Sequence, residues 1–181
     1  MTLAKLIKNI NFTKTTTNIK NHMIKLLING QTYEYDGAPE MPILWALRDV
    51  MGLTGTKYAC GKGLCGSCTI LLNGDPVKSC VAPMSVADGK EIITIEGLAN
   101  ENNYLQQAWE EFNVPQCGFC QPGQLIASLA LLNNNADPSD DDIQTALNGN
   151  ICRCGTYTRI KKAIHRAAEL KRQHRSELSK S

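Results

Sequence analysis

The stretch GTKYACGKGLCGSCT, residues 55–69, places three cysteines within nine residues of one loop. With Cys80, which follows later, the spacing becomes C-x4-C-x2-C-x11-C. The same loop contains Gly61, Gly63 and Gly66. Because glycine adopts positive φ at little cost, such a loop curves tightly and brings backbone N–H groups close to sulfur atoms. The sequence therefore predicts a point where several thiolates converge.

The spacing of the first three cysteines matches that of plant-type 2Fe–2S clusters. Structural zinc sites more often take their cysteines as two separate C-x2–4-C pairs, whereas here three cysteines crowd one loop. Zinc ligation and unliganded core cysteines are the alternatives to a cluster. The expected ligands of the first 2Fe–2S cluster are Cys60, Cys65, Cys68 and Cys80.

A second cysteine set lies toward the C-terminus as a C-x2-C pair and a C-x-C pair. Each pair stands just before a predicted helix, and helix N-termini favour thiolates and anionic clusters through their unpaired N–H groups and partial positive charge. On spacing alone a zinc site stays open; a second redox centre beside the first favours iron–sulfur. The expected ligands are Cys117, Cys120, Cys152 and Cys154.

The eight cysteines could instead form four disulfides, which are typical of exported proteins. No convincing export signal precedes residue 23, so this alternative is disfavoured.

Outward from the first loop, the sequence predicts an α+β domain. Asn29-Gly30 separates two strand-like runs and predicts a hairpin over residues 23–35. Pro42 suits the first turn of a helix at 42–51. Its expected buried face consists of Leu44, Leu47, Val50 and Met51. Further strands are expected at 69–72, 77–80 and 91–96, with a four-residue turn at 73–76.

After Gly97 the hydrophobic period becomes helical. Ser139, followed three residues later by Asp142, resembles a capping box. The expected helices span 102–113, 122–132, 139–147 and 156–171, which fits a small four-helix bundle. The predicted division of the chain is a disordered basic extension (1–22), a ferredoxin-like domain (23–97), a helical domain (98–172) and a flexible basic tail (173–181).

The charge distribution excludes nucleic acid as a partner. The whole chain has a net charge of +2, but the basic residues gather at its ends, and residues 23–156 hold seven basic and fifteen acidic residues. Nucleic-acid binders have a basic body interleaved with aromatic residues, which form only 6% of this chain. No apolar run reaches the length of a membrane span. We therefore expect a cytoplasmic protein, with co-export to the periplasm alongside a signal-bearing partner as the alternative.

Three motifs together resemble those of a known family. They are GTKYACG…CGSCT at 55–69, QCGFCQPG at 116–123 and NICRCGTY at 150–157. In this order they closely resemble the small iron–sulfur subunits of the xanthine oxidase family of molybdenum hydroxylases. The segment PILWALRD at 42–49 is most similar to the branch with isoquinoline 1-oxidoreductase and related aldehyde dehydrogenase small subunits. Gln121 departs from the family, which more often has threonine or another small residue there.

This resemblance implies a β-grasp 2Fe–2S domain followed by a four-helix 2Fe–2S domain. It also implies a large molybdopterin-binding partner carrying a molybdenum–pterin cytosine dinucleotide. Electrons then pass from that centre to the helical-domain cluster, next to the ferredoxin-domain cluster, and finally to an FAD subunit or a cytochrome c-type acceptor. The resemblance places Gln116 and Cys154 beside the pterin of the partner.

The residues themselves indicate no site for substrate chemistry in this chain. It has three histidines, no Ser-His-Asp grouping, no H-E-x-x-H and no phosphate loop. His165 is expected at the surface of the last helix. The expected function is therefore electron relay within an aldehyde or N-heterocycle dehydrogenase complex, with a stand-alone two-cluster ferredoxin or a zinc-stabilised interaction module as the alternatives.

Overall fold

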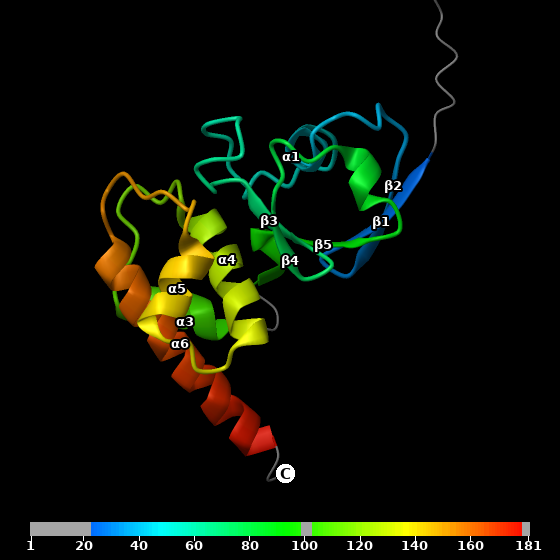
Figure 1. Ribbon diagram of the computed structural model, residues 1–181. Helices are drawn as coiled ribbons and strands as arrows, with labels where there is room; N and C mark the ends of the chain where they lie inside the picture. The colour runs from blue at the N-terminus through cyan, green and yellow to red at the C-terminus, as the bar shows by residue number, and fades with distance from the viewer. Residues whose placement is uncertain (1–22, 99–102, 179–181) are drawn as a thin grey trace, which may run out of the picture.

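The computed structural model describes residues 23–98 and 103–178, so the predicted extension at 1–22 lies outside the described residues. A five-stranded mixed sheet forms one half of the molecule, and helices gather beside it in the other half (Figure 1). The strand order is β2-β1-β5-β3-β4. The strands are β1 (Ile24–Ile28), β2 (Gln31–Tyr35), β3 (Thr69–Leu72), β4 (Asp75–Lys78) and β5 (Glu91–Ile93). The helices of the second half are α3 (Asn103–Glu111), α4 (Gln121–Asn134), α5 (Asp140–Leu147) and α6 (Tyr157–Leu178).

Both hairpins of the sheet close on an Asn-Gly turn. The φ angles are 51° at Asn29 and 81° at Gly30, and 50° at Asn73 and 89° at Gly74. Two central residues with positive φ match the twist of the flanking strands. The predicted four-residue turn at 73–76 is wrong, because two residues suffice and β4 begins at once. Pro76 is tolerated within β4 because that strand lies at the sheet edge.

The strand predicted at 91–96 ends at Ile93 because the next residue bonds to a turn. Thr94 is fully buried, and its N–H donates to Oδ1 of Asn29 at 2.9 Å. The Asn29 amide in turn donates to the Thr94 hydroxyl at 2.9 Å. The first hairpin thus takes over the hydrogen bonds that a longer β5 would make, and Ile95–Gly97 continue as a short 3₁₀ helix.

The segment predicted as a helix at 42–51 is helical but contains a π-helical turn. One α-turn, α1 (Ile43–Trp45), is followed by π-helix from Ala46 to Val50. A π-turn widens the helix and shifts the following side chains around its axis. Leu44 and Leu47 are buried as predicted, whereas Val50 is 61% exposed. The prediction that Val50 lies on the buried face is therefore wrong, because it assumed the regular spacing of an α-helix.

The later helices follow the sequence closely. Ser139 caps α5 with the predicted capping box: its hydroxyl accepts from the Asp142 N–H, and the Asp142 carboxylate accepts from the Ser139 N–H. The last helix is longer than predicted, because residues 173–178, expected in a flexible tail, continue α6. Lys171 and Arg172 of α6 donate to the carbonyls of Leu132 and Ala136 at the end of α4 and just beyond it.

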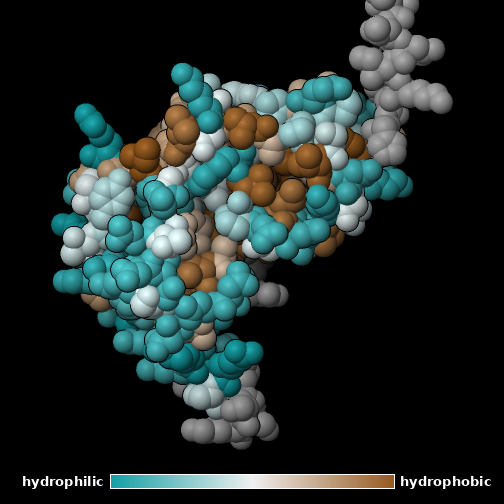
Figure 2. Space-filling view, viewed as in Figure 1, coloured by the Kyte–Doolittle hydropathy of each residue, from teal (hydrophilic) through white to brown (hydrophobic). Residues whose placement is uncertain are grey.

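The strand β3 joins the two halves of the molecule. Ile70 and Leu72 lie in the core that β1, β2 and α1 share, whereas Leu71 lies in the core of the helices. Successive side chains of a strand point to opposite faces, so β3 is covered on both sides. In Figure 2 the visible surface of the helical half is mostly polar, and hydrophobic residues gather toward the sheet half. None of the described helices is long and apolar enough to cross a bilayer.

The first turn of α4 lies directly against the first cysteine loop. A Cβ placed on Gly123 would meet the carbonyl oxygen of Gly66 and lie 3.1 Å from Cα of Ser67. Both neighbours are backbone atoms, which cannot rotate away as a side chain does. Glycine at 123 is therefore a requirement of the contact between the two halves.

We expect Gly123→Ala to destabilise the chain, although Gly→Ala within a helix ordinarily stabilises by roughly 0.5–1 kcal/mol. Overpacking against fixed backbone costs about 1–3 kcal/mol, so the sign reverses. Urea unfolding of the two proteins measures the difference. A Gly123→Ala chain as stable as the parent chain would show that α4 and the loop separate without cost.

Candidate metal centres

The first cysteine set converges where the loop at 60–68 meets the segment after β4. The Cys60 sulfur accepts hydrogen bonds from the N–H groups of Lys62 and Cys65, each at 3.4 Å. Cys68 and Cys80 are buried beside Leu44. Cys60 and Cys65 are partly exposed. The loop thus opens to solvent on one side and rests against the sheet half on the other.

The three glycines of this loop adopt the predicted left-handed conformation. Their φ angles are 67° at Gly61, 72° at Gly63 and 75° at Gly66. At Gly66 a Cβ would also collide with the side chain of Asn150, on the loop before the second cysteine set. Glycine at 66 therefore serves both the curvature of the loop and the close approach of the second set.

The thiols of the first set differ strongly in acidity. Hydrogen bonds from the backbone N–H groups of Lys62 and Cys65 lower the pKa of Cys60 to about 6. Burial raises the pKa of Cys68 to about 11. N–H donors stabilise negative charge on sulfur, and removal from water disfavours it. Cys60 is therefore readily ionised to the thiolate, whereas Cys68 keeps its proton until a metal binds and displaces it.

The second set is built on two helix starts, as predicted. Cys120 is the residue immediately before α4, and Cys152 precedes α6 by five residues. The Cys152 N–H donates to the Tyr157 hydroxyl at 2.8 Å, and its sulfur lies 3.3 Å from the Thr156 hydroxyl. Cys120 and Cys152 are buried, Cys154 is partly exposed and Cys117 is exposed.

The same asymmetry of acidity appears in the second set. Burial raises the pKa of Cys120 to about 12, and the neighbouring Cys152 thiolate adds to that shift. Burial also acts to raise the pKa of Cys152, but hydrogen bonds from the side chain and backbone of Thr156 outweigh it and lower this pKa to about 7. Sulfurs from the two pairs are therefore near enough to influence each other's charge.

Gln121, the departure from the family pattern, does take part in local bonding. Its amide lies 3.5 Å from the Cys120 sulfur, and its carbonyl oxygen accepts from the Trp109 indole N–H at 2.7 Å. The side chain thus links the sulfur to a core tryptophan of α3. A small residue at this position would leave the indole N–H to find another partner.

A polar network that the sequence did not reveal connects the two sets. Lys78 donates to both Asn150 and Thr69, and Gln124 donates to the Asn150 carbonyl at 2.9 Å. The Ile151 N–H donates to the Cys65 carbonyl at 2.9 Å. Of the buried side-chain oxygens in the described ranges, those of Thr56 and Gln124 (Oε1) have no hydrogen-bond partner. The only sequence signal for this network is the position of Asn150 two residues before a cysteine.

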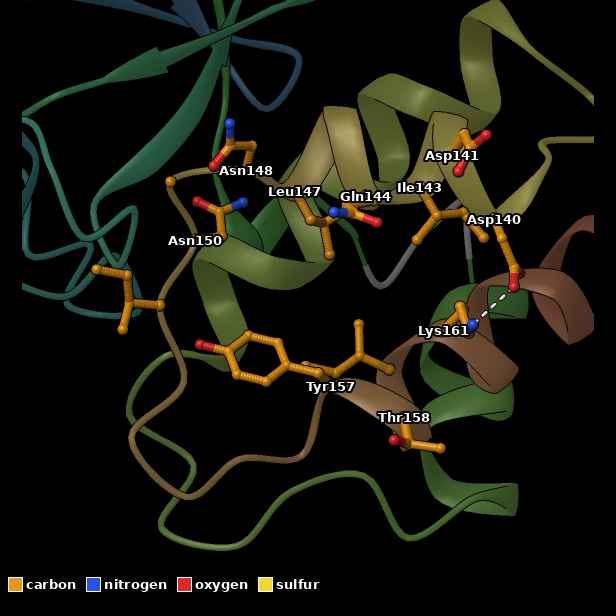
Figure 3. Close-up of a pocket in the computed structure, with 13 residues that line it drawn as sticks. Asp140, Asp141, Ile143, Gln144, Leu147, Asn148, Asn150, Tyr157, Thr158 and Lys161 are labelled. Atoms are coloured by element: carbon orange, nitrogen blue, oxygen red, sulfur yellow. Dashed lines mark hydrogen bonds and ion pairs between the residues drawn. The ribbon is translucent and has the colours of Figure 1, made fainter.

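A hollow of about 630 Å³ lies beside the second set, between α5, the start of α6 and the loop at 148–151 (Figure 3). Asp140 and Lys161 form an ion pair of 2.6 Å at its rim. His165 also contacts the Asp140 carboxylate, at 2.8 Å, and its side chain is 41% exposed. Its predicted surface position is therefore confirmed. Gln116, expected at the pterin, is exposed at the end of the segment before Cys117.

The donor atoms present suit iron–sulfur clusters. All eight cysteines lie in the described ranges, and none of them is joined to another in a disulfide. Within residues 23–98 and 103–178, no three His, Cys, Asp or Glu side chains are grouped as ligands of a single metal ion. All-cysteine ligation, glycine curvature and N–H donors to sulfur are what a 2Fe–2S cluster requires.

Two family models match neighbouring parts of the chain that overlap at residues 94–99. Residues 26–99 match the 2Fe–2S iron–sulfur cluster binding domain, and residues 94–165 match the [2Fe-2S] binding domain. The chain is similar to the alpha chain of isoquinoline 1-oxidoreductase from Brevundimonas diminuta, with 49% identity over 81% of this chain and 98% of that protein. It is also 41% identical to a nicotinate dehydrogenase subunit from Pseudomonas putida, over 83% of this chain and 97% of that one.

Solved structures show the same arrangement. Quinoline 2-oxidoreductase from Pseudomonas putida 86 contains a chain that superposes with a TM-score of 0.79 and 40% identity, covering 84% of this chain and 96% of that one. The aldehyde oxidoreductase from Desulfovibrio gigas superposes with a TM-score of 0.81 and 35% identity, but this chain covers only 17% of it. The chain therefore carries two 2Fe–2S binding domains.

The difference in acidity predicts a difference in reactivity of the folded, iron-free chain. Alkylation follows the thiolate fraction. Cys60, with its pKa lowered to about 6, is therefore half-ionised near that pH and mostly thiolate above it. Cys120, with its pKa raised to about 12, stays protonated and reacts slowly at neutral pH. Iodoacetamide labelling followed by peptide mass spectrometry measures both rates, and equal rates at neutral pH would contradict this assignment.

Proposed function

The chain belongs to the small iron–sulfur subunits of the xanthine oxidase family, and on this basis we propose that it relays electrons from a molybdenum centre in a partner chain to an external acceptor. When bound, each 2Fe–2S cluster supplies a one-electron redox couple. The residues of this chain supply the thiolate ligands, determine the charge around them and fix the distance between the two cysteine sets.

The proposed ligands follow the two sets. Cys60, Cys65, Cys68 and Cys80 hold one cluster in a β-grasp domain of residues 23–97, and Cys117, Cys120, Cys152 and Cys154 hold the other in a four-helix domain of residues 98–172. The mixed sheet with its glycine loop supports the first half of this division, and helices α3 to α6 support the second.

One hydrogen bond between the two cysteine sets is the main support for the proposed electron relay. The Ile151 N–H donates to the Cys65 carbonyl at 2.9 Å, and Ile151 is bonded to Cys152. A ligand of the first set is thus joined to a ligand of the second set by one hydrogen bond and a short run of backbone. A chain that used its two centres independently would not need them at this contact.

The second set is the proposed receiver of electrons from the partner. Cys117 is exposed and Cys154 is partly exposed, so this side of the helical half is accessible to another protein chain. Gln116 is exposed beside Cys117, which supports its proposed contact with a molybdenum–pterin cytosine dinucleotide of the large subunit. The backbone at Cys154 is the second proposed contact with the pterin.

The substrate of the complex is proposed to be an N-heterocycle or an aldehyde. The chain spans 98% of a relative named for isoquinoline and 97% of one named for nicotinate, which supports this proposal. The acceptor is an FAD subunit or a cytochrome. It takes electrons from the first set, whose loop is partly exposed at Cys60 and Cys65.

The iron and sulfide content tests the proposal directly. The purified complex should be red-brown, contain about four irons and four acid-labile sulfides per copy of this chain, and show two S = ½ signals by EPR after dithionite reduction. We expect reduction potentials above the roughly −400 mV of plant-type clusters, because the chain accepts electrons from a mild donor. A colourless zinc protein, or one paramagnetic species, would contradict the proposal.

Two serine variants test the order of electron flow. Cys80→Ser should remove the first cluster and stop transfer to the external acceptor, while substrate still reduces the molybdenum centre and the second cluster. Cys117→Ser is the matched change in the other set: it should remove the second cluster and leave the first cluster unreduced by substrate. Stopped-flow reduction with EPR sampling follows each centre. Normal turnover of the Cys80→Ser complex with its natural acceptor would show that electrons do not pass through the first cluster, which would contradict the proposed order.

A further inference from the structure

Lys78, at the end of the edge strand β4, hydrogen-bonds to one residue beside the first cysteine loop and to one residue on the loop at 148–151, before Cys152. It is half-buried, and its ammonium donates to Oδ1 of Asn150 at 2.9 Å and to the Thr69 hydroxyl at 3.0 Å. Both acceptors are buried: Asn150 is 4% exposed and Thr69 is 1% exposed. The charge is thus fixed in one place rather than extended into solvent, as a surface lysine would be.

The two acceptors belong to the two cysteine sets. The Thr69 hydroxyl donates to the Gly66 carbonyl at 2.6 Å, so it is tied to the loop of the first set. Asn150 precedes Cys152 by two residues on the loop that links α5 to α6 (Figure 3). Its own carbonyl accepts from Gln124 of α4. Lys78 therefore lies between the two sets, held by one residue from each side.

Lys78 lies on the side of the first set. It is the register partner of Thr69, which directly follows Cys68, and it precedes Cys80 by two residues. Two proposed ligands of one cluster are thus close neighbours of a single half-buried charge. Charges in such a place are screened less than charges at the surface.

We propose that Lys78 is a positioning residue whose fixed positive charge raises the reduction potential of the cluster held by Cys60, Cys65, Cys68 and Cys80. The inference rests on the proposed function, since it assigns the potential step that drives electrons from the second set toward the first. Reduction adds one electron and breaks no bond, so a nearby cation favours the reduced state by Coulomb attraction.

The size of the effect follows from Coulomb's law. A unit charge about 10 Å from another, at an effective dielectric constant of about 20, changes an equilibrium constant by roughly tenfold. For a one-electron couple, a tenfold change corresponds to about 59 mV. A step of this size is enough to direct electrons between two clusters that would otherwise have similar potentials.

Redox-titrated EPR of the complete complex tests the proposal. Lys78→Met and Lys78→Gln both remove the charge, and glutamine keeps a hydrogen-bond donor for Asn150, so it preserves the fold if methionine does not. In either variant, the signal that Cys80→Ser abolishes should titrate about 59 mV lower, a tenfold loss in the equilibrium constant. Lys78→Arg keeps the charge, so the equilibrium constant for reduction of this cluster should stay within a factor of two of the parent value.

Lys25→Met is the matched control, because Lys25 pairs with Glu34 in the hairpin of β1 and β2, at the opposite side of the sheet from β4. It should leave both potentials unchanged. Thermal unfolding of each variant distinguishes a purely structural role of Lys78 from an electrostatic one. A lower unfolding midpoint with unchanged reduction potentials would overturn the proposal. An equal shift in the potentials of both clusters would also overturn it. A parent complex without two iron–sulfur signals would overturn the proposed function instead.

Discussion

The approach of two backbones at Gly66 and Gly123 is the constraint on which the rest of the arrangement depends. A Cβ on Gly123 would collide with the Gly66 carbonyl, and a Cβ on Gly66 would collide with Asn150. With both side chains absent, the first turn of α4 lies directly on the first cysteine loop. The same contact brings Ile151 within hydrogen-bond distance of Cys65, so the separation of the two cysteine sets is fixed by backbone packing.

Each cysteine set combines a buried thiol of raised pKa with a thiol that hydrogen bonds make more acidic. In the first set these are Cys68 and Cys60, and in the second they are Cys120 and Cys152. The cause is the balance between burial and hydrogen bonding at each sulfur: burial dominates at Cys68 and Cys120, whereas N–H or hydroxyl donors outweigh it at Cys60 and Cys152.

Local signals in the sequence predicted local structure well, and tertiary contacts account for the differences. The Asn29-Gly30 turn and the Ser139–Asp142 capping box follow from the residues themselves, and both are present. The short β5 depends instead on a contact between Asn29 and Thr94, which are far apart in the chain. The π-turn at Ala46–Val50, which exposes Val50, has no signal in a pattern read with a period of 3.6 residues.

The sequence by itself determined the chemistry of this protein: the spacing of its cysteines, the glycines among them and the helix starts behind them specify which atoms are available as ligands and which loops can curve around a cluster. Only the tertiary structure decided how the two sets are related. Lys78, Thr69 and Asn150 meet across the boundary between sheet and helices, and no spacing along the chain records that meeting. The physical reason is that ligation depends on short loops, whereas the electric field around each set depends on every charge that folding brings near it.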